Sequence, residues 1–379
     1  MKLARHAPAG RPVPRAVFAA GRQEGRSPWP GLHSELFASG TAALGAALKL
    51  ALGQLPPGAP RRVTLPAYAC PNLVAATLWA EGTPEYYDLA PDASGPASGV
   101  VESLSRSRDF VMLHVDAFGA DTLPASISGV PEGLVVHDLA QSFAPFLEGW
   151  RPRARFSIAS FGRAKPLSLT LGGALIAALP AGSIALAEGN LPTVDVSGAK
   201  LSLRAAVYAL SLHPAAFGFL SRIPALGIGQ TSFAPLTHAD RLPREWHTAL
   251  AAAVAELRGS LPLITAQTAA MLRLARESGA QVPACALAAE GLFPLWRVPV
   301  LCPDSESATV IAREGAHLGL SRLYSRPLPQ IMGMAAAEVA PRWPNATGIA
   351  GRLITLPTHG RLGERRESQL RRLLESRLR

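Results

Sequence analysis

Short apolar segments alternate with Ala- and Leu-rich segments through residues 40–179. The run AALGAALKLALGQL follows a Ser-Gly-Thr triplet at 39–41 and is typical of a helix that begins at a hydroxyl cap and ends near Gly53. RRVTLPAY then predicts a strand, NLVAATLWAEG a helix that stops at Gly82, and PEYYDLA another strand. Because strands that alternate with helices form a mostly parallel sheet, we predict an α/β protein that binds ligands at the carboxyl ends of its strands.

Four further apolar segments extend this predicted sheet: FVMLHVDAFG, LVVHDLAQSF, RFSIASF and GGALIAAL. Beyond about residue 240 the pattern changes to a long helix, a strand at FPLWRVPVLC, a helix at ESATVIAREGAHLG and a closing amphipathic helix, which is typical of a small α+β domain. We therefore predict an N-terminal arm over residues 1–30, a large domain over 31–240 and a small C-terminal domain over 241–379.

Charge and cysteine content narrow the class of partner. Among 379 residues there are 37 Lys and Arg against 27 Asp and Glu, a net charge of +10, but the arginines are dispersed among Ala, Leu and Pro. Dispersed arginine disfavours nucleic acid and favours attraction of an anionic small substrate or an anionic membrane surface. Three cysteines without a CxxC pair or metal-ligand spacing, and an N-terminus without an apolar signal core, predict a cytoplasmic protein without a metal site.

The most hydrophobic long stretch, residues 201–229, contains Arg204, His213, Pro214, Arg222 and Pro224, so we do not expect it to span a membrane. Two interpretations stay open for it. We favour two core helices, because apolar helices usually pack inside a protein, and keep a membrane-contacting amphipathic surface as the alternative. The arginines of segment 364–379 predict the solvated face of a helix, with an anionic lipid or nucleotide partner as the alternative.

Polar residues stand at the ends of several predicted elements. The triplet at 39–41 offers backbone N–H groups and a helix N-terminus, which suit a phosphate. Asp138 follows an apolar strand, where its charge needs a cationic partner, and Gln141 lies three residues later. Lys165 follows the strand RFSIASF in a loop. Each of these also has an ordinary interpretation, as a helix cap, an ion-pair partner, a surface amide or a solvated lysine.

Together these groups match what pyridoxal 5′-phosphate (PLP) requires from a protein. A lysine amine can bond to the aldehyde of the cofactor, which neither arginine nor serine can do. The carboxylate of Asp138 would keep the pyridine nitrogen protonated, and Ser160 would add a hydroxyl to the phosphate site at 39–41. The sequence therefore predicts a PLP enzyme in which Lys165 is the catalytic residue.

The order of the motifs resembles that of the DegT/StrS-type sugar aminotransferases. The resemblance rests on FASGTAAL, VTLPAYACPN, YYDLAPD, VVHDLAQSF, SFGRAKPLSLTLGGALIA and ITLPTHGRL. It implies a PLP-dependent transaminase of fold type I, the architecture of aspartate aminotransferase, with a large domain built on a mostly parallel sheet. It also implies a homodimer, glutamate as amino donor and a nucleotide-linked keto-sugar as acceptor, in polysaccharide or glycoconjugate biosynthesis.

The resemblance further assigns roles to single residues. Lys165 would form the Schiff base and move the proton, Asp138 would contact the pyridine nitrogen, and Gln141 would contact the ring hydroxyl. His359 in LPTHGR resembles a turn residue of the family rather than a catalytic base. The other cofactor-binding residues that the resemblance implies are Gly40, Thr41, Ala42 and Ser160 at the phosphate and Cys70 near the place of a ring-stacking aromatic residue.

Three motifs depart from the family pattern. Cys70 stands in place of the aromatic residue, Asp116 stands where the HxYG motif has His, and the GxNxR motif, which reaches the phosphate of the neighbouring subunit, has only Gln230 or Thr231 as substitutes. These departures keep open a PLP-binding regulatory or scaffold protein of glycan biosynthesis. A related sugar dehydratase is a further alternative, but Lys165 argues against it because those enzymes have His at that place.

Overall fold

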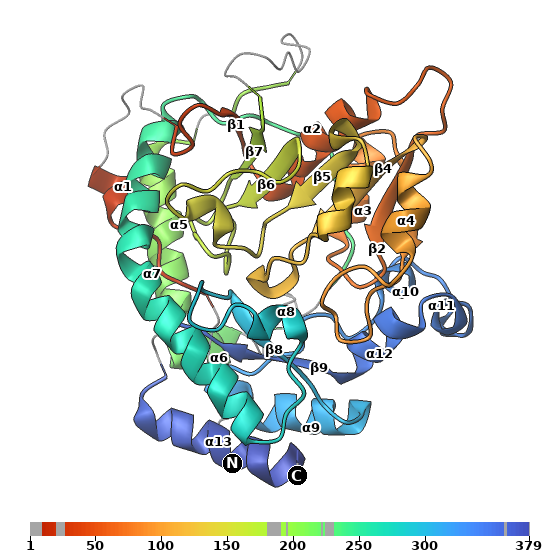
Figure 1. The fold of residues 1–379 in the computed structure, drawn as a ribbon. Helices are drawn as coiled ribbons and strands as arrows, with labels where there is room; N and C mark the ends of the chain where they lie inside the picture. Colours follow the sequence, from red (N-terminus) through yellow and green to blue (C-terminus); the bar gives the residue numbers. More distant parts are fainter. Residues whose placement is uncertain are drawn as a thin grey trace.

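The computed structural model describes residues 10–19, 27–179, 191–194, 196–220, 223, 231–359 and 362–378 (Figure 1). Parts of the predicted arm over 1–30 and of the hydrophobic stretch 201–229 lie outside these residues, as does Gln230. Within the described chain, a seven-stranded sheet and a two-stranded sheet form the two centres of the fold.

The large sheet is mostly parallel, as predicted. Its strand order is β1-β7-β6-β5-β4-β2-β3, in which β3, β2, β4, β5 and β6 run parallel, whereas β7 is antiparallel to both β6 and β1. The apolar segments identified in the sequence form all of its strands except β1, whose sequence HSELF lacks a continuous apolar run. The strands are β1 (His33–Phe37), β2 (Arg62–Pro66), β3 (Thr83–Tyr87), β4 (Phe110–Val115), β5 (Val135–Asp138), β6 (Phe156–Ser160) and β7 (Gly173–Ala177).

Helix α2 (Gly40–Leu52) is the central helix of the large sheet. Ser39 caps it by accepting the Ala42 N–H at 3.0 Å, and Gly53 follows its last residue, as the sequence predicts. Its Ala- and Leu-rich face is buried against β6 and β7, so that its N-terminus is held near the ends of these strands. The other helices packed around this sheet are α3 (Asn72–Trp79) and α4 (Val100–Ser105).

The C-terminal region forms a second core around two antiparallel strands, β8 (Arg297–Leu301) and β9 (Leu353–Pro357). Its last helix, α13 (Glu364–Leu378), buries Leu370 and Leu374. Arg371 and Arg377 of α13 form ion pairs on its exposed side, in agreement with a solvated face. The other helices here are α8 (Ala284–Leu287), α9 (Ser305–Glu314), α10 (Leu328–Ile331), α11 (Ala336–Arg342) and α12 (Pro344–Arg352).

Helix α7 (Trp246–Glu277) is long and runs along the side of both sheets (Figure 1). By length and hydropathy alone it could cross a membrane, but it buries side chains such as Leu250, Val254 and Ile264 in the protein core. It therefore ties the two sheets together, and the predicted boundary at residue 240 stays a prediction. The remaining short elements are α1 (Ala16–Ala19) and the 3-10 helices η1 (Ala117–Gly119), η2 (Ala125–Gly129), η3 (Glu132–Leu134), η4 (Ala144–Phe146) and η6 (Ala316–Leu318).

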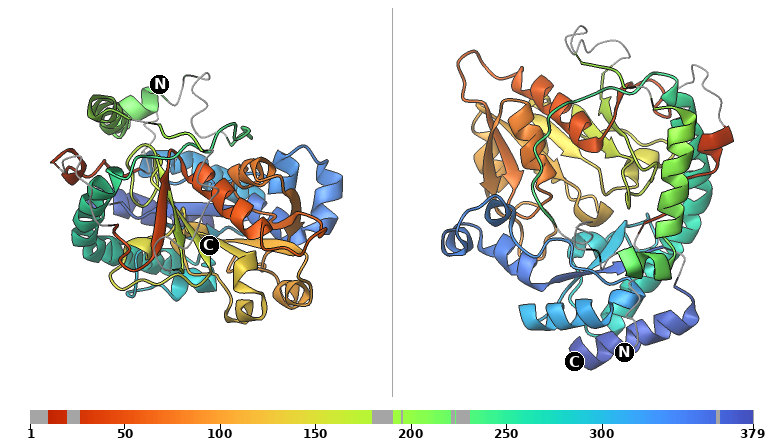
Figure 2. Two further views of the ribbon diagram at one scale, coloured as in Figure 1. Left: turned by 90° about the horizontal axis from the view of Figure 1, so that it is seen from above. Right: turned by 180° about the vertical axis from the view of Figure 1, so that it is seen from behind.

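The described part of the hydrophobic stretch forms two helices, α5 (Gly198–Ser211) and α6 (Pro214–Leu220), at the periphery of the molecule (Figure 2). The core interpretation holds for only one side of α5, which buries residues such as Ala205 and Tyr208. The other side leaves Leu203, Val207 and Leu210 between 61% and 68% exposed. The sequence could not distinguish the two sides, because both are apolar.

Candidate active site

A cavity of about 390 Å³ lies at the carboxyl ends of β5 and β6, beside the N-terminus of α2. This is the edge at which the sequence predicts a ligand. Residues that are far apart in the chain meet here. The lining includes six of the predicted site residues: Gly40, Thr41, Cys70, Asp138, Ser160 and Lys165.

The turn that begins α2 packs tightly on the end of β6. A Cβ atom added to Gly40 would lie 2.5 Å from the Ser160 Oγ atom, and one added to Gly173 would lie 2.5 Å from the Gly40 Cα atom. Since both distances are far below van der Waals contact, a side chain fits at neither position. The close approach places the positive end of the α2 dipole beside the Ser160 hydroxyl, an arrangement suited to a phosphate group.

Asp138, the last residue of β5, is buried at the floor of the cavity. Its Oδ1 atom accepts the Ala140 N–H at 2.8 Å, which fixes the orientation of the carboxylate. Burial raises the pKa of Asp138 above its ordinary value, and the nearby Lys165 ammonium opposes part of that rise. The ionised form of Asp138 therefore depends on a cationic group in the cavity.

Lys165 extends from the loop that joins β6 to β7, and the backbone of the residue before it, Ala164, is held from two sides. The Ala164 N–H donates to the Tyr208 hydroxyl at 3.0 Å, and the Ala164 carbonyl accepts from Trp296 Nε1 at 2.8 Å. Ala164 has a φ of 59°, a left-handed conformation that alanine rarely adopts, so these bonds stabilise an unusual backbone shape. Tyr208 of α5 and Trp296, just before β8, thus fix the base of the lysine side chain.

Thr170 lines the cavity from the same loop and has a φ of 68°. This conformation is rarer still for a β-branched residue, and such strain concentrates at functional sites. The Thr170 Oγ1 atom is also buried without a hydrogen-bond partner among the described residues. Because an unsatisfied buried hydroxyl costs about 1–3 kcal/mol, a polar ligand in the cavity would stabilise this residue.

Two of the predicted cofactor contacts are not among the residues that line the cavity, and their roles stay predictions. The Ala42 N–H is already used by the Ser39 cap. Gln141 is buried behind the cavity, where its Oε1 atom accepts the Phe118 N–H at 2.9 Å and its Nε2 atom donates to the Tyr324 hydroxyl at 3.3 Å. Thr231, a proposed substitute in the GxNxR motif, is likewise not part of the lining.

Tyr324 is a neighbour of the site that sequence reasoning missed. Its hydroxyl contacts the Cys70 thiol, and its ring meets that of Tyr68 edge to face with 5.4 Å between centroids. Burial raises the pKa values of Tyr324 and Cys70, so both side chains are neutral near pH 7. Asn72 was missed as well, although it lines the cavity and donates to Thr41 Oγ1 at 3.2 Å.

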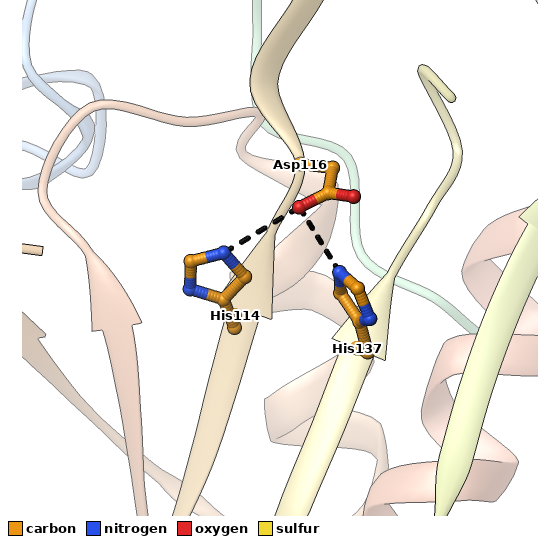
Figure 3. A group of neighbouring side chains, drawn as sticks. All are labelled: His114, Asp116 and His137. Atoms are coloured by element: carbon orange, nitrogen blue, oxygen red, sulfur yellow. Dashed lines mark ion pairs between the residues drawn. The ribbon is translucent and has the colours of Figure 1, made fainter. Parts of the chain in front are cut away.

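His114, Asp116 and His137 form a buried triad near the ends of β4 and β5 (Figure 3). Asp116 Oδ1 is 3.0 Å from His137 Nε2 and 3.6 Å from His114 Nε2. Burial alone would raise the pKa of Asp116, but His137 and His114 together lower it well below its ordinary range. The departure from the HxYG motif thus places a carboxylate between two imidazoles.

The triad is better suited to hydrogen bonding than to metal binding. A metal-bound histidine almost always donates its other ring N–H to a carboxylate, a carbonyl or water. Here the Nδ1 atoms of both His114 and His137 are buried without a partner among the described residues. Asp116 instead accepts from the Thr122 N–H at 3.1 Å, and its own N–H donates to the Asp138 carbonyl at 3.1 Å. The triad therefore holds the end of β4 against the residue at the cavity floor.

No family model and no curated protein sequence matches this chain. Solved structures do match it over most of its length. A sugar aminotransferase of Streptococcus pneumoniae in its PMP form covers 98% of this chain and 97% of its own, with 16% identity and a TM-score of 0.63. The chain has the fold of an aminotransferase. A DegT/DnrJ/EryC1/StrS aminotransferase from Brucella abortus shares 18% identity, with a TM-score of 0.59 and coverage of 91% and 85%.

Helicobacter pylori PseC, an aminotransferase of pseudoaminic acid biosynthesis, also matches this chain over most of its length. It shares 14% identity and covers 98% of this chain and 99% of its own, with a TM-score of 0.63. These likenesses confirm the predicted α/β architecture of fold type I, with its mostly parallel sheet and smaller C-terminal α+β region. At such low identity they concern the fold, so the activity has to be argued from the residues of the cavity.

Proposed function

We propose that the protein is a PLP-dependent aminotransferase that acts on a keto-sugar. The observation that carries the proposal is the convergence of Lys165, Asp138 and the N-terminus of α2 around one cavity. These three elements supply an amine, a buried carboxylate and a phosphate site. Solved structures of the same fold include a sugar aminotransferase in PMP and PLP forms, which supports this choice of cofactor.

The residues present fit PLP. Gly40, Thr41 and Ser160 would hold its phosphate, because all three line the cavity at the N-terminus of α2. Asp138 would accept a hydrogen bond from the pyridine nitrogen, and the positive ring would keep this buried carboxylate ionised. When bound, the cofactor supplies an aldehyde and a ring that withdraws electrons from the substrate carbon next to nitrogen.

The protein itself contributes a movable base, Lys165, and a fixed carboxylate, Asp138. Lys165 would take the proton from the α-carbon of the amino donor and deliver it to the cofactor side, since its amine projects into the cavity from a firmly held peptide. Asp138 would stay ionised throughout, because it is fixed by the Ala140 N–H and cannot rotate away from the ring. The buried floor excludes water from the reacting atoms.

The finer parts of the proposal concern substrate, assembly and location. We propose a nucleotide-linked keto-sugar as acceptor and glutamate as donor, which the net charge of +10 supports because both are anionic. The exposed apolar side of α5 supports a homodimer, since it would be covered by a second copy. Three unpaired cysteines support a cytoplasmic location.

Absorbance of the purified protein mixed with PLP tests the proposal. A visible band that can be fixed by borohydride reduction, lost in Lys165→Ala and kept in the matched control Lys49→Ala, is expected. Glutamate should convert that band to the one of the aminated cofactor, and a keto-sugar nucleotide should restore it. A band that ignores every amino donor would instead indicate the PLP-binding scaffold, and the absence of any lysine-dependent band would refute the cofactor assignment.

A further inference from the structure

Of the charged residues that the structure places in the cavity lining, Arg204 is the one that the proposed function leaves without a role. It lies on α5, the peripheral helix, yet it lines the same cavity as Lys165 and Thr41. The side chain forms no hydrogen bond or ion pair with any residue that the structure describes. An arginine that reaches a concave site without a partner is available to a ligand.

The charges of the cavity are unbalanced. Its charged lining residues are Asp138, Lys165 and Arg204, and the N-terminus of α2 adds a partial positive charge. Asp138 is buried at the floor and orients through the Ala140 N–H, so it cannot neutralise the outer part of the cavity. Two cations and a helix N-terminus therefore face one carboxylate, which attracts a ligand that carries more than one negative group.

One of those negative groups is already accounted for under the proposed function. The cofactor phosphate would lie between Gly40, Thr41 and Ser160, and Lys165 would be bonded to the cofactor. Arg204 comes from a different element, exposed on the outer side of the cavity. Its planar guanidinium can form two parallel hydrogen bonds with a carboxylate or a phosphate, which an ammonium group cannot do.

We propose that Arg204 binds an anionic group of the substrate and so determines which substrates enter the cavity. The inference rests on the proposed function and deepens it. The group is a carboxylate if it belongs to the amino donor, or a phosphate if it belongs to the acceptor. Both are oxyanions of the same geometry, and α5 thereby becomes the substrate-recognising helix of the site.

Two unreactive probes distinguish these sources: glutarate, which mimics the donor without its amino group, and uridine diphosphate. Their dissociation constants would be measured on the PLP-loaded protein from the change in cofactor absorbance. Arg204→Gln should weaken the binding of one probe about tenfold, a typical loss for one charge-assisted contact at an exposed site. Arg204→Lys should retain part of the affinity, because it keeps the charge but not the planar fork.

Lys200→Gln is the matched control. Lys200 lies one turn earlier on α5 and is exposed, but it does not line the cavity, so its loss changes the net charge equally without affecting either probe. A loss confined to glutarate assigns the donor carboxylate, and a loss confined to uridine diphosphate assigns the acceptor phosphate. The inference is overturned if neither probe binds the wild type, if Lys200→Gln has the same effect, or if Arg204→Gln weakens only PLP. Failure of the proposed function would be seen separately, as a wild type without the lysine-dependent band.

Discussion

The two sides of the cavity are built in different ways. The inner side consists of strand ends and a helix N-terminus, in which Asp138 and Ser160 are buried and Gly40 leaves no spare space. The outer side is a peripheral helix, α5, that contributes Arg204 and leaves three large apolar side chains exposed. Residues that act on every substrate are expected on a rigid part of a protein, here the inner side. Residues that select between substrates are expected on a part that tolerates substitution, here the outer side.

The largest effect should come from Lys165→Ala. Proton transfer by a positioned group contributes up to roughly 10⁴-fold in rate, so transaminase activity should fall by about that factor. The unfolding transition should change little, because Lys165 is only half-buried and lies in a loop. Steady-state rates together with thermal unfolding would measure both. If Lys165→Ala kept a tenth of the activity, Lys165 would not be the main proton-transfer group. The inner side of the cavity would then not be the part that carries the chemistry.

Asp116→Asn tests whether the inner side depends on its buried triad. Asp116 is a buried charged acceptor for the Thr122 N–H and lies within 3.6 Å of both imidazoles, so its replacement should lower the free energy of unfolding by about 3 kcal/mol at neutral pH. The pKa of Asp116 is lowered in the folded state, so its contribution is present above its ordinary value of about 3.8 and is lost as pH falls below it. Urea unfolding at pH 7 and pH 2 should therefore show that the stability advantage of the wild type over Asp116→Asn is much smaller at pH 2, because most of it is lost only well below pH 3.8. An equal difference at both pH values would show that the charge is not involved.

Asp138→Asn should reduce activity by roughly 10²-fold, because an amide stabilises a protonated ring far less than a carboxylate does. The variant should also shift the pH at which the lysine-bound cofactor loses its proton, which absorbance titration measures. Asp304→Asn serves as its control, since Asp304 is an exposed cap of α9. A similar loss of activity in the two variants would mean that Asp138 acts through stability alone.

Thr170→Gly should stabilise the protein, because it relieves the left-handed strain and removes the unpartnered hydroxyl. Glycine also increases the conformational entropy of the unfolded chain, which opposes this gain. The free energy of unfolding should therefore rise by a net of about 1 kcal/mol. Thr170→Val also removes the unpartnered hydroxyl but keeps the strain, so it should stabilise less than Thr170→Gly does if the strain is real. If the Thr170 hydroxyl contacts PLP, bound PLP should reduce the difference in stability between Thr170→Gly and the wild type. Loss of stability in the glycine variant would exclude strain at this position.

Replacing Leu203 or Leu210 by Ser should have the smallest effect on folding. These side chains are exposed, so the free energy of unfolding should change by less than about 0.5 kcal/mol for each. Sedimentation of the same variants should show a weaker homodimer if the second copy covers this face. A large destabilisation of the isolated chain would show that α5 belongs to the rigid side after all.

The sequence predicted the inner side of the cavity because its signals are local. A helix cap at Ser39, an apolar strand that ends at Asp138 and a lysine after the next strand each depend on a few neighbouring residues. The edge of a parallel sheet then brings them together. The same signals gave the strands and the helix α2 nearly at their observed bounds.

The outer side could not be predicted in this way, because it depends on contacts between distant segments. Nothing near Tyr208 or Trp296 in the sequence indicates that both hold the peptide before Lys165. Arg204 was seen only as an interruption of an apolar stretch, since its direction is set by the packing of α5. Gln141 of the large-sheet region donates a hydrogen bond to Tyr324 of the C-terminal region, and the periodicity of apolar residues cannot predict a contact between such distant segments.

The loop that carries Lys165 begins and ends in neighbouring strands, β6 and β7, which pair over five residues from Phe156 with Ala177 to Ser160 with Gly173. Such a hairpin joins residues close in sequence, so it can form early, before the distant strands of the sheet assemble. The Lys165 amine would then be placed on its hairpin first, and the surrounding sheet would enclose it afterwards. We expect a newly made chain to expose this lysine loop before any part of the molecule is able to bind a cofactor.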